Sequence, residues 1–145
     1  MYDIEKINKI IRDIEKYFLE LKNLNLNVGN IEISEKFYSA SMVIFTIINR
    51  MKDLSEEIIM KNEFGMPSSF EQYFDVLKER GIIDKNLSIE LKKLVKDRNL
   101  FAHEYFDMDR KQVLNVSKRI HYINDFIERV KKLVAKDAKN KRGIK

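Results

Sequence analysis

The sequence contains no cysteine, only one proline and only four glycines among 145 residues. Without cysteine, neither a disulfide framework nor a thiolate metal site is available. The small number of glycines and prolines leaves few places where regular structure is broken. No apolar run approaches the roughly 20 residues that a membrane-spanning helix requires. These absences exclude disulfide-stapled and membrane-embedded classes of protein.

A chain of this length can bury one sizeable core, and two independent domains are not expected. The segment Met1–Lys6 is charged and amphipathic, unlike a secretory signal. No glycine-rich phosphate-binding loop occurs, which disfavours a nucleotide-dependent enzyme. We therefore expect a cytoplasmic protein without a cofactor.

The net charge of +5 is concentrated at the carboxyl end. Residues 131–145 contain seven basic side chains and one acidic one, so the rest of the chain has a net charge of −1. We assign residues 1–135 to a single helical domain and residues 136–145 to a basic tail. A solvated terminus is one interpretation of the tail, and phosphate contacts to RNA are the other.

Apolar residues recur at three- and four-residue spacings almost throughout, which predicts an all-α protein. A first helix carries its apolar stripe from Ile4 to Leu21 and ends near the Asn-rich segment 23–30. A second, long helix is predicted to begin with Ser34 as its N-cap and to end before Gly65 and Pro67. Its predicted core residues are Phe37, Ala40, Ser41, Ile44, Ile47, Ile48, Met51, Leu54 and Ile58.

A third, shorter helix is predicted to open with a capping box formed by Ser68 and Glu71 and to stop at Gly81. The fourth spans about residues 85–105. Asp109 and Gln112 form the capping signature of a fifth helix, whose apolar positions continue to residue 134. The expected architecture is an up-and-down bundle of four main helices plus a shorter one.

The segment 96–105 gathers the residues best suited to chemistry: Arg98, Asn99, His103 and Tyr105. An unperturbed imidazole, with a pKa of about 6.5, transfers protons near neutrality. Arg98 adds a permanent cation whose planar donors suit phosphate. This segment is therefore the part of the sequence that points to chemistry.

The spacing Arg-x4-His-x-Tyr, with Asn directly after the Arg, resembles the signature of HepT-like toxins of the HEPN superfamily. Met108 and Asp109 resemble the start of the family's next helix. The segments Gly65–Pro67, Ser69–Phe74 and Leu77–Asp84 resemble its middle region. The resemblance covers roughly residues 2–135 and implies a HEPN-like helical fold.

On one helix, Arg98 and Tyr105 lie about 20° apart around the axis, whereas Arg98 and His103 lie about 140° apart. Asn99 and His103 share a stripe. One straight helix therefore does not aim Arg98 and His103 at the same point. Two copies facing each other across a symmetric dimer would bring them together, and the resemblance implies such a homodimer with both motifs in one cleft.

The expected activity is metal-independent cleavage of RNA, with tRNA among the candidate substrates. We expect His103 to transfer protons and Arg98 to neutralise the phosphate, both as catalytic residues. Asn99 would orient His103, and Tyr105 would contact the substrate. The resemblance also implies a nucleotidyltransferase antitoxin as partner and makes Tyr105 a candidate acceptor of an adenylyl group.

Simpler interpretations stay open for each residue. Arg98 is often a surface ion-pairing residue, with Asp97 or Glu104 nearby, and His103 near a helix end often just complements the helix dipole. No metal is expected, because Asp107 stands where a zinc-protease motif requires its second His, and Asp109 suits capping better than metal binding. A non-catalytic HEPN-type binding module and a helical scaffold with a basic tail remain alternatives.

Overall fold

The computed structural model describes residues 1–103 and 109–143, including the side chains of residues 1–99 and 109–140. Over these residues the chain forms six α-helices and one short 3-10 helix, with no strand. They are α1 (Ile4–Asn23), η1 (Asn30–Glu32), α2 (Ser34–Lys61), α3 (Phe70–Glu79), α4 (Lys85–His103), α5 (Arg110–Arg119) and α6 (His121–Gly143). The predicted all-α fold is confirmed.

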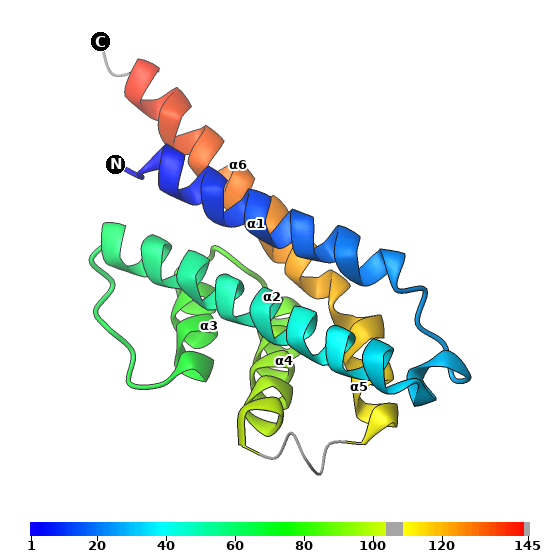
Figure 1. Ribbon diagram of the computed structural model, residues 1–145. Helices are drawn as coiled ribbons and strands as arrows, with labels where there is room; N and C mark the ends of the chain where they lie inside the picture. Colours follow the sequence, from blue (N-terminus) through cyan, green and yellow to red (C-terminus); the bar gives the residue numbers. More distant parts are fainter. Residues whose placement is uncertain (104–108, 144–145) are drawn as a thin grey trace.

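Helix α2 is the centre of the bundle and packs against α1, η1, α3, α4 and α5 (Figure 1). Helix α6 packs on α4, and its far end meets the start of the chain, where the Met1 amino group lies 3.5 Å from Asp137 Oδ2. Within the described part of the chain, no helix is both long and apolar enough to cross a lipid bilayer.

The apolar stripes of the helices meet in one core. All apolar residues predicted for the buried side of α2 are buried, whereas Ser41 is half-buried and donates to Phe37 O at 2.8 Å. Phe74 of α3 and Phe126 of α6 are fully buried, and their rings meet edge to face with centroids 5.9 Å apart. Burying such a side chain contributes about 1.5–3 kcal/mol, so these stripes hold the bundle together.

Two predicted helix caps are wrong by one residue. Helix α2 has Ile33 as its N-cap, because Phe37 N already bonds to Ile33 O at 3.0 Å, and Ser34 is the first helical residue. Helix α3 is capped by Ser69, which accepts a hydrogen bond from Gln72 N at 3.4 Å.

The Gln72 side chain completes the second cap. Its Oε1 accepts from Ser68 N at 3.0 Å and from Ser68 Oγ at 2.7 Å, so Gln72 takes the reciprocal role predicted for Glu71. Ser68 and Ser69 are both possible caps, and Glu71 and Gln72 are both possible acceptors. The residue at which the helix begins decides which pair is used. The predicted stop at Gly81, which has a φ of +75°, is confirmed.

The segment predicted as one fifth helix is divided at Ile120 into α5 and α6. Ile120 alone lies between the two helices, and its carbonyl oxygen accepts from Ile123 N at 3.0 Å. No glycine or proline marks this point, so the apolar spacing continued through it. The Asp109–Gln112 capping box that opens α5 is confirmed. Helix α6 extends to Gly143, through most of the segment assigned to the basic tail.

Candidate functional site

Helix α4 carries the motif and is fixed at both ends of its described part. Asp84 caps its start, with Leu87 N donating to Asp84 Oδ1 at 2.8 Å. Leu91, Leu94 and Val95 are fully buried and orient the helix against the core. Asp97, Arg98 and Asn99, which follow this buried face, are half-buried at the edge of the core.

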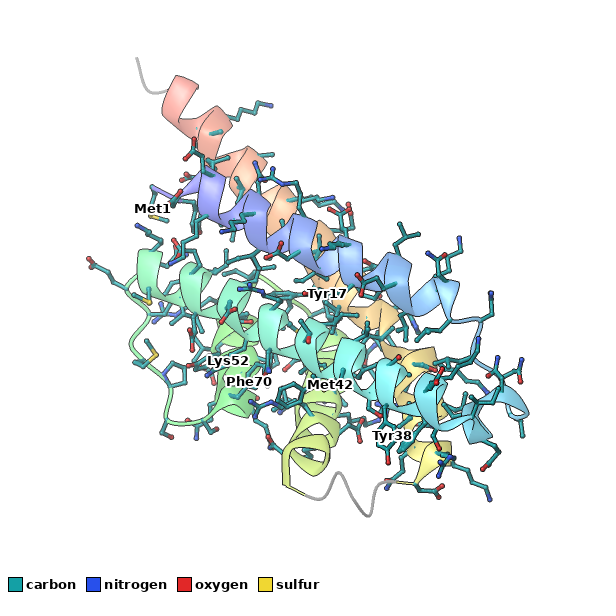
Figure 2. All side chains as sticks on the ribbon, in the orientation of Figure 1. Met1, Tyr17, Tyr38, Met42, Lys52 and Phe70 are labelled. Carbon is teal, nitrogen blue, oxygen red and sulfur yellow. The ribbon has the colours of Figure 1, made fainter. Side chains whose placement is uncertain are left out.

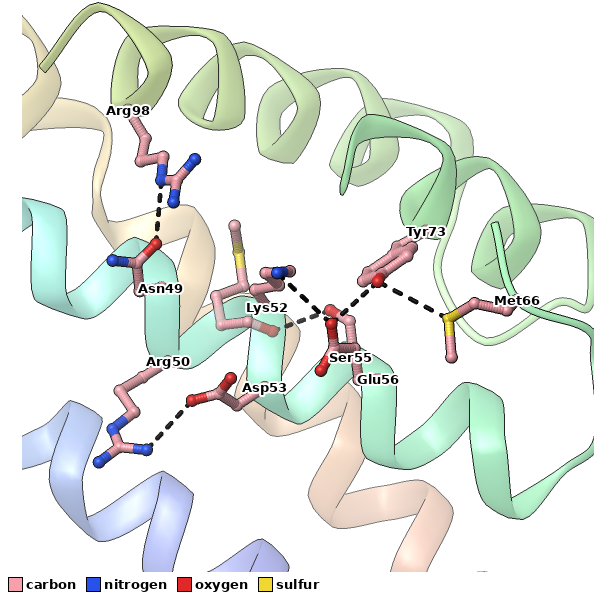
Figure 3. A network of polar contacts seen from close by, with 10 residues as sticks. Asn49, Arg50, Lys52, Asp53, Ser55, Glu56, Met66, Tyr73 and Arg98 are labelled. Carbon is pink, nitrogen blue, oxygen red and sulfur yellow. Dashed lines mark hydrogen bonds and ion pairs between the residues drawn. The ribbon is translucent and has the colours of Figure 1, made fainter. Parts of the chain in front are cut away.

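Arg98 points from α4 toward α2 (Figure 3). Its Nε donates to Asn49 Oδ1 at 2.9 Å, and its Nη1 donates to Asn99 Oδ1 at 3.1 Å. The guanidinium lies over the Phe45 ring, 5.2 Å from the ring centroid. A half-buried cation is thus held by two neutral amide oxygens and an aromatic face.

The charge of Arg98 is not cancelled by a carboxylate among the residues that the structure describes. Its neighbour Asp97 pairs instead with Arg119 Nη2 at the end of α5. Glu104, the other acid considered as a partner, lies outside the described residues. A cation oriented by neutral groups retains its attraction for an anion such as phosphate.

The other motif residues are described to different extents. His103 is the last residue of α4, and its backbone lies about 140° around the helix axis from that of Arg98. The side chain of His103 is not among those that the structure describes. Tyr105 also lies outside the described residues. Asn99 Oδ1 accepts from Arg98, and its predicted contact with His103 stays a prediction.

The start of α5 is held against η1 and α2 by Arg110. Arg110 Nε donates to Ile31 O at 3.2 Å, and its guanidinium lies 4.6 Å from the centroid of the Phe37 ring. Asp109 caps the helix by accepting from Lys111 N at 3.0 Å. Arg110 and Asp109 therefore fix the start of α5 against η1 and α2.

The sequence did not single out Phe45, Asn49 or Arg110. Phe45 and Asn49 are spaced four apart on one stripe of α2, which is a signal that they share a face. Nothing in the chain, however, links that stripe to an arginine 49 positions later. Such a link arises only from the packing of α2 against α4.

The same stripe of α2 continues into an exposed apolar surface. Tyr38 is 59% exposed and Met42 is 65% exposed, and both lie on the turns of α2 that precede Phe45 (Figure 2). Large exposed apolar side chains in a row are typical of protein interaction surfaces. This surface is continuous with the face that holds Arg98.

A hollow of about 660 Å³ lies at the other end of α4, against α6. Its charged lining is predominantly acidic, with Asp84, Glu90, Asp125 and Glu128 outnumbering Arg129 and Lys132. Such a surface disfavours phosphate. Among the described residues, no group of three or more His, Cys, Asp or Glu side chains could hold a metal ion.

Comparison with known proteins points to one family. A family model described as "Ribonuclease HepT-like" matches residues 7–133. A relative from Shewanella oneidensis, named mRNA nuclease HepT, is 31% identical over 74 residues, which cover 51% of this chain and 54% of that protein. The aligned segment thus spans about half of the Shewanella protein.

Two further relatives extend the likeness to nearly the whole chain. A putative RNase of Archaeoglobus fulgidus is 29% identical over 134 residues, or 92% of this chain and 93% of that protein. A solved structure, described as tri-AMPylated Shewanella oneidensis HEPN toxin in complex with MNT antitoxin, superposes with a TM-score of 0.82. It is 22% identical and is matched over 91% of this chain and 99% of that one, so this likeness shows a shared fold.

Proposed function

Because the chain belongs to the HepT-like ribonuclease family, we propose that it is a metal-independent endoribonuclease and the toxin of a toxin–antitoxin pair. The family resemblance predicted from residues 98–105 is confirmed by this membership. The observation that carries the activity is Arg98, a half-buried cation oriented by neutral amides and placed five residues before His103. We place the protein in the cytoplasm, where RNA substrates are available.

The reaction begins when the 2′-hydroxyl of the RNA attacks the adjacent phosphorus. His103 of one protomer accepts the hydroxyl proton, and His103 of its partner donates a proton to the departing 5′-oxygen. Arg98 stabilises the negative charge that develops on the phosphorus-bound oxygens. The products are a 2′,3′-cyclic phosphate and a free 5′-hydroxyl, and no metal ion enters the balance.

The site is a composite of two copies of the chain. The separation of about 140° between Arg98 and His103 around α4 supports this arrangement, because one copy alone directs them apart. The exposed Tyr38 and Met42, next to the Arg98 face, supply an apolar surface for the second copy. Dimerisation therefore completes the catalytic groups of each cleft.

The antitoxin is a nucleotidyltransferase that acts on Tyr105. The transfer joins the phenol oxygen of Tyr105 to the α-phosphate of ATP and releases pyrophosphate. The added phosphodiester places negative charge in a cationic cleft and so excludes RNA by repulsion and occlusion. The AMPylated toxin–antitoxin complex of similar fold supports this partner class.

Cleavage of RNA by the purified protein in the presence of a chelator tests the activity. We expect cutting of unmodified RNA, cyclic phosphate ends, and no cutting where the nucleotide before the scissile phosphate carries 2′-deoxy or 2′-O-methyl ribose. His103→Ala should abolish cutting. His121→Ala is the matched control, since His121 is the other histidine and its Nδ1 lies 2.9 Å from Lys118 O, on the surface of the bundle.

Cleavage at the parent rate by pure, dimeric His103→Ala protein would disprove the assigned role. RNA binding without any cleavage would instead favour the non-catalytic HEPN-type module. The regulatory step is tested by mass spectrometry after co-expression with the adjacent nucleotidyltransferase. An adenylyl group on the parent but not on Tyr105→Phe is expected, and an unmodified toxin from protected cells would contradict the modification.

A further inference from the structure

Asn49 is the described side chain that connects the core of α2 directly to the motif arginine. It is half-buried, and its Oδ1 accepts a hydrogen bond from Arg98 Nε at 2.9 Å (Figure 3). One turn earlier on α2, Phe45 lies under the guanidinium plane. Together the two residues fix both the direction and the tilt of the Arg98 side chain.

The contacts leave much of the guanidinium available. Arginine has five N–H donors, and the described residues engage the one on Nε and one on Nη1. The remaining donors on Nη1 and Nη2 make no hydrogen bond within the described part of the chain. A bidentate pair of N–H groups is the arrangement that binds phosphate oxygens best.

The acceptor at position 49 is neutral, and among the half-buried arginines that the structure describes Arg98 is the one without a carboxylate oxygen within 4.0 Å; the exposed Arg12 and Arg80 also lack one. Arg50, Arg110, Arg119 and Arg129 each lie within 4.0 Å of a carboxylate oxygen, at distances from 2.5 to 3.6 Å. An aspartate at position 49 would hold Arg98 equally well but would cancel its charge. Asparagine provides the geometry and preserves the cation.

We infer that Asn49 is the positioning residue of the active site, which sets Arg98 in its phosphate-binding orientation without neutralising it. The inference rests on the proposed ribonuclease function and extends it to a residue on another helix. Asn49 acts through Arg98 and does not touch the reacting atoms. Phe45 supports the same orientation from below the guanidinium plane.

The test compares Asn49→Ala and Asn49→Asp with the parent, in RNA affinity, single-turnover cleavage and thermal unfolding. We expect Asn49→Ala to lower the cleavage rate by about 10- to 100-fold, because a displaced catalytic group loses about that much. Asn49→Asp should be at least as stable as the parent yet bind RNA more weakly. The slope of log affinity against log salt concentration should be smaller by about one for Asn49→Asp, as for Arg98→Ala, because one phosphate contact is lost.

Asn62 provides the control. Its Nδ2 donates to the Tyr2 hydroxyl oxygen at 2.7 Å at the far end of α2, so Asn62→Ala and Asn62→Asp remove an amide hydrogen bond on the same helix away from the site. Both should leave cleavage and the salt dependence unchanged. In an Arg98→Ala background, Asn49→Ala should add no further loss, since its effect passes through Arg98.

The inference is overturned if Asn49→Asp binds and cuts RNA like the parent, or if Asn49→Ala reduces cleavage equally with and without Arg98. A parent protein that binds RNA but does not cut it overturns the proposed activity, and the affinity and salt measurements then decide the role of Asn49. A parent that neither binds nor cuts RNA overturns both. Loss of stability in Asn49→Asp that matches its loss of binding would indicate a merely structural role.

Discussion

Asp97 and Arg98 are consecutive residues of α4 whose side chains bind different helices. Asp97 accepts from Arg119 Nη2 of α5, whereas Arg98 Nε donates to Asn49 of α2 at 2.9 Å. Successive positions on a helix are about 100° apart around its axis, so the two side chains point in different directions. Together they fix the rotation of α4 about its axis, and thereby the direction in which the motif is presented.

Loss of the Asp97–Arg119 pair should weaken the bundle where α4 meets α5. Asp97→Asn removes the charge of a carboxylate that is only 25% exposed, and we expect a loss of about 1 kcal/mol in the free energy of unfolding. Urea denaturation measures it. Asp125→Asn, at an exposed carboxylate of α6, is the control. Equal stability losses in both variants would contradict a specific role for the pair.

Arg98 should not be replaceable by lysine. Arg98→Lys keeps the charge but loses the Nε donor to Asn49 and the planar donor pair, so we expect RNA cleavage to fall by about 100-fold. Single-turnover cleavage at saturating RNA measures the change. Arg129→Lys, which keeps a cation near Asp84 on the far side of the bundle, should cut at the parent rate. Parent-like cleavage by Arg98→Lys would mean that charge alone suffices.

The Phe74–Phe126 contact should dominate the core between α3 and α6. Both rings are fully buried, so Phe126→Ala should reduce the free energy of unfolding by about 3–5 kcal/mol. Leu19→Ala, at a side chain that is 58% exposed, should change it by less than about 0.5 kcal/mol. Urea unfolding of both variants provides the comparison. A small effect of Phe126→Ala would show that the core relaxes around the cavity.

The Tyr73 hydroxyl should make stability sensitive to alkaline pH. Burial, followed by its hydrogen bond to Glu56 at 2.9 Å and the charge of that carboxylate, raises the pKa of Tyr73 to about 12. The folded state therefore holds this proton more tightly than the unfolded state, whose tyrosine pKa is about 10. Its contribution to stability is complete below pH 10 and is lost as pH rises toward 12.

Comparison of the parent with Tyr73→Phe isolates this contribution. The parent should be the more stable protein at pH 8, and the difference in unfolding free energy should shrink steadily above pH 10. Urea unfolding at increasing pH, up to the highest value at which both proteins fold, measures the difference. A difference that is constant with pH would contradict the role of the Tyr73 proton.

The basic end of α6 should affect RNA affinity more than catalysis. Lys136 and Lys139 are exposed, and replacing both with Gln should lower the salt dependence of RNA binding by at most about two phosphate contacts. The cleavage rate at saturating RNA should be unchanged. A rate loss as large as that of Arg98→Ala would place this segment in the catalytic cleft.

Much of the architecture could be predicted because helix periodicity is a local property. The apolar stripe of α2, the stop at Gly81 and the Asp109–Gln112 cap all followed from residues within a few positions of one another. The predictions failed where two local solutions were nearly equal. Ser68 and Ser69 both suit an N-cap, and the division at Ile120 has no glycine or proline to mark it.

The fold class and the family could be predicted from the sequence, because helix periodicity and motif spacing are properties of one chain, whereas the roles of the motif residues stay predictions. The surroundings of Asp97 and Arg98 depend instead on how the helices pack. In the structure, Asn49 and Phe45 of α2 lie against Arg98, and Asp97 pairs with Arg119 of α5. The reason is physical: α2 and α4 pack through buried apolar faces that many sequences could provide, and the polar pairs across their boundary depend on the helix rotation that this packing selects.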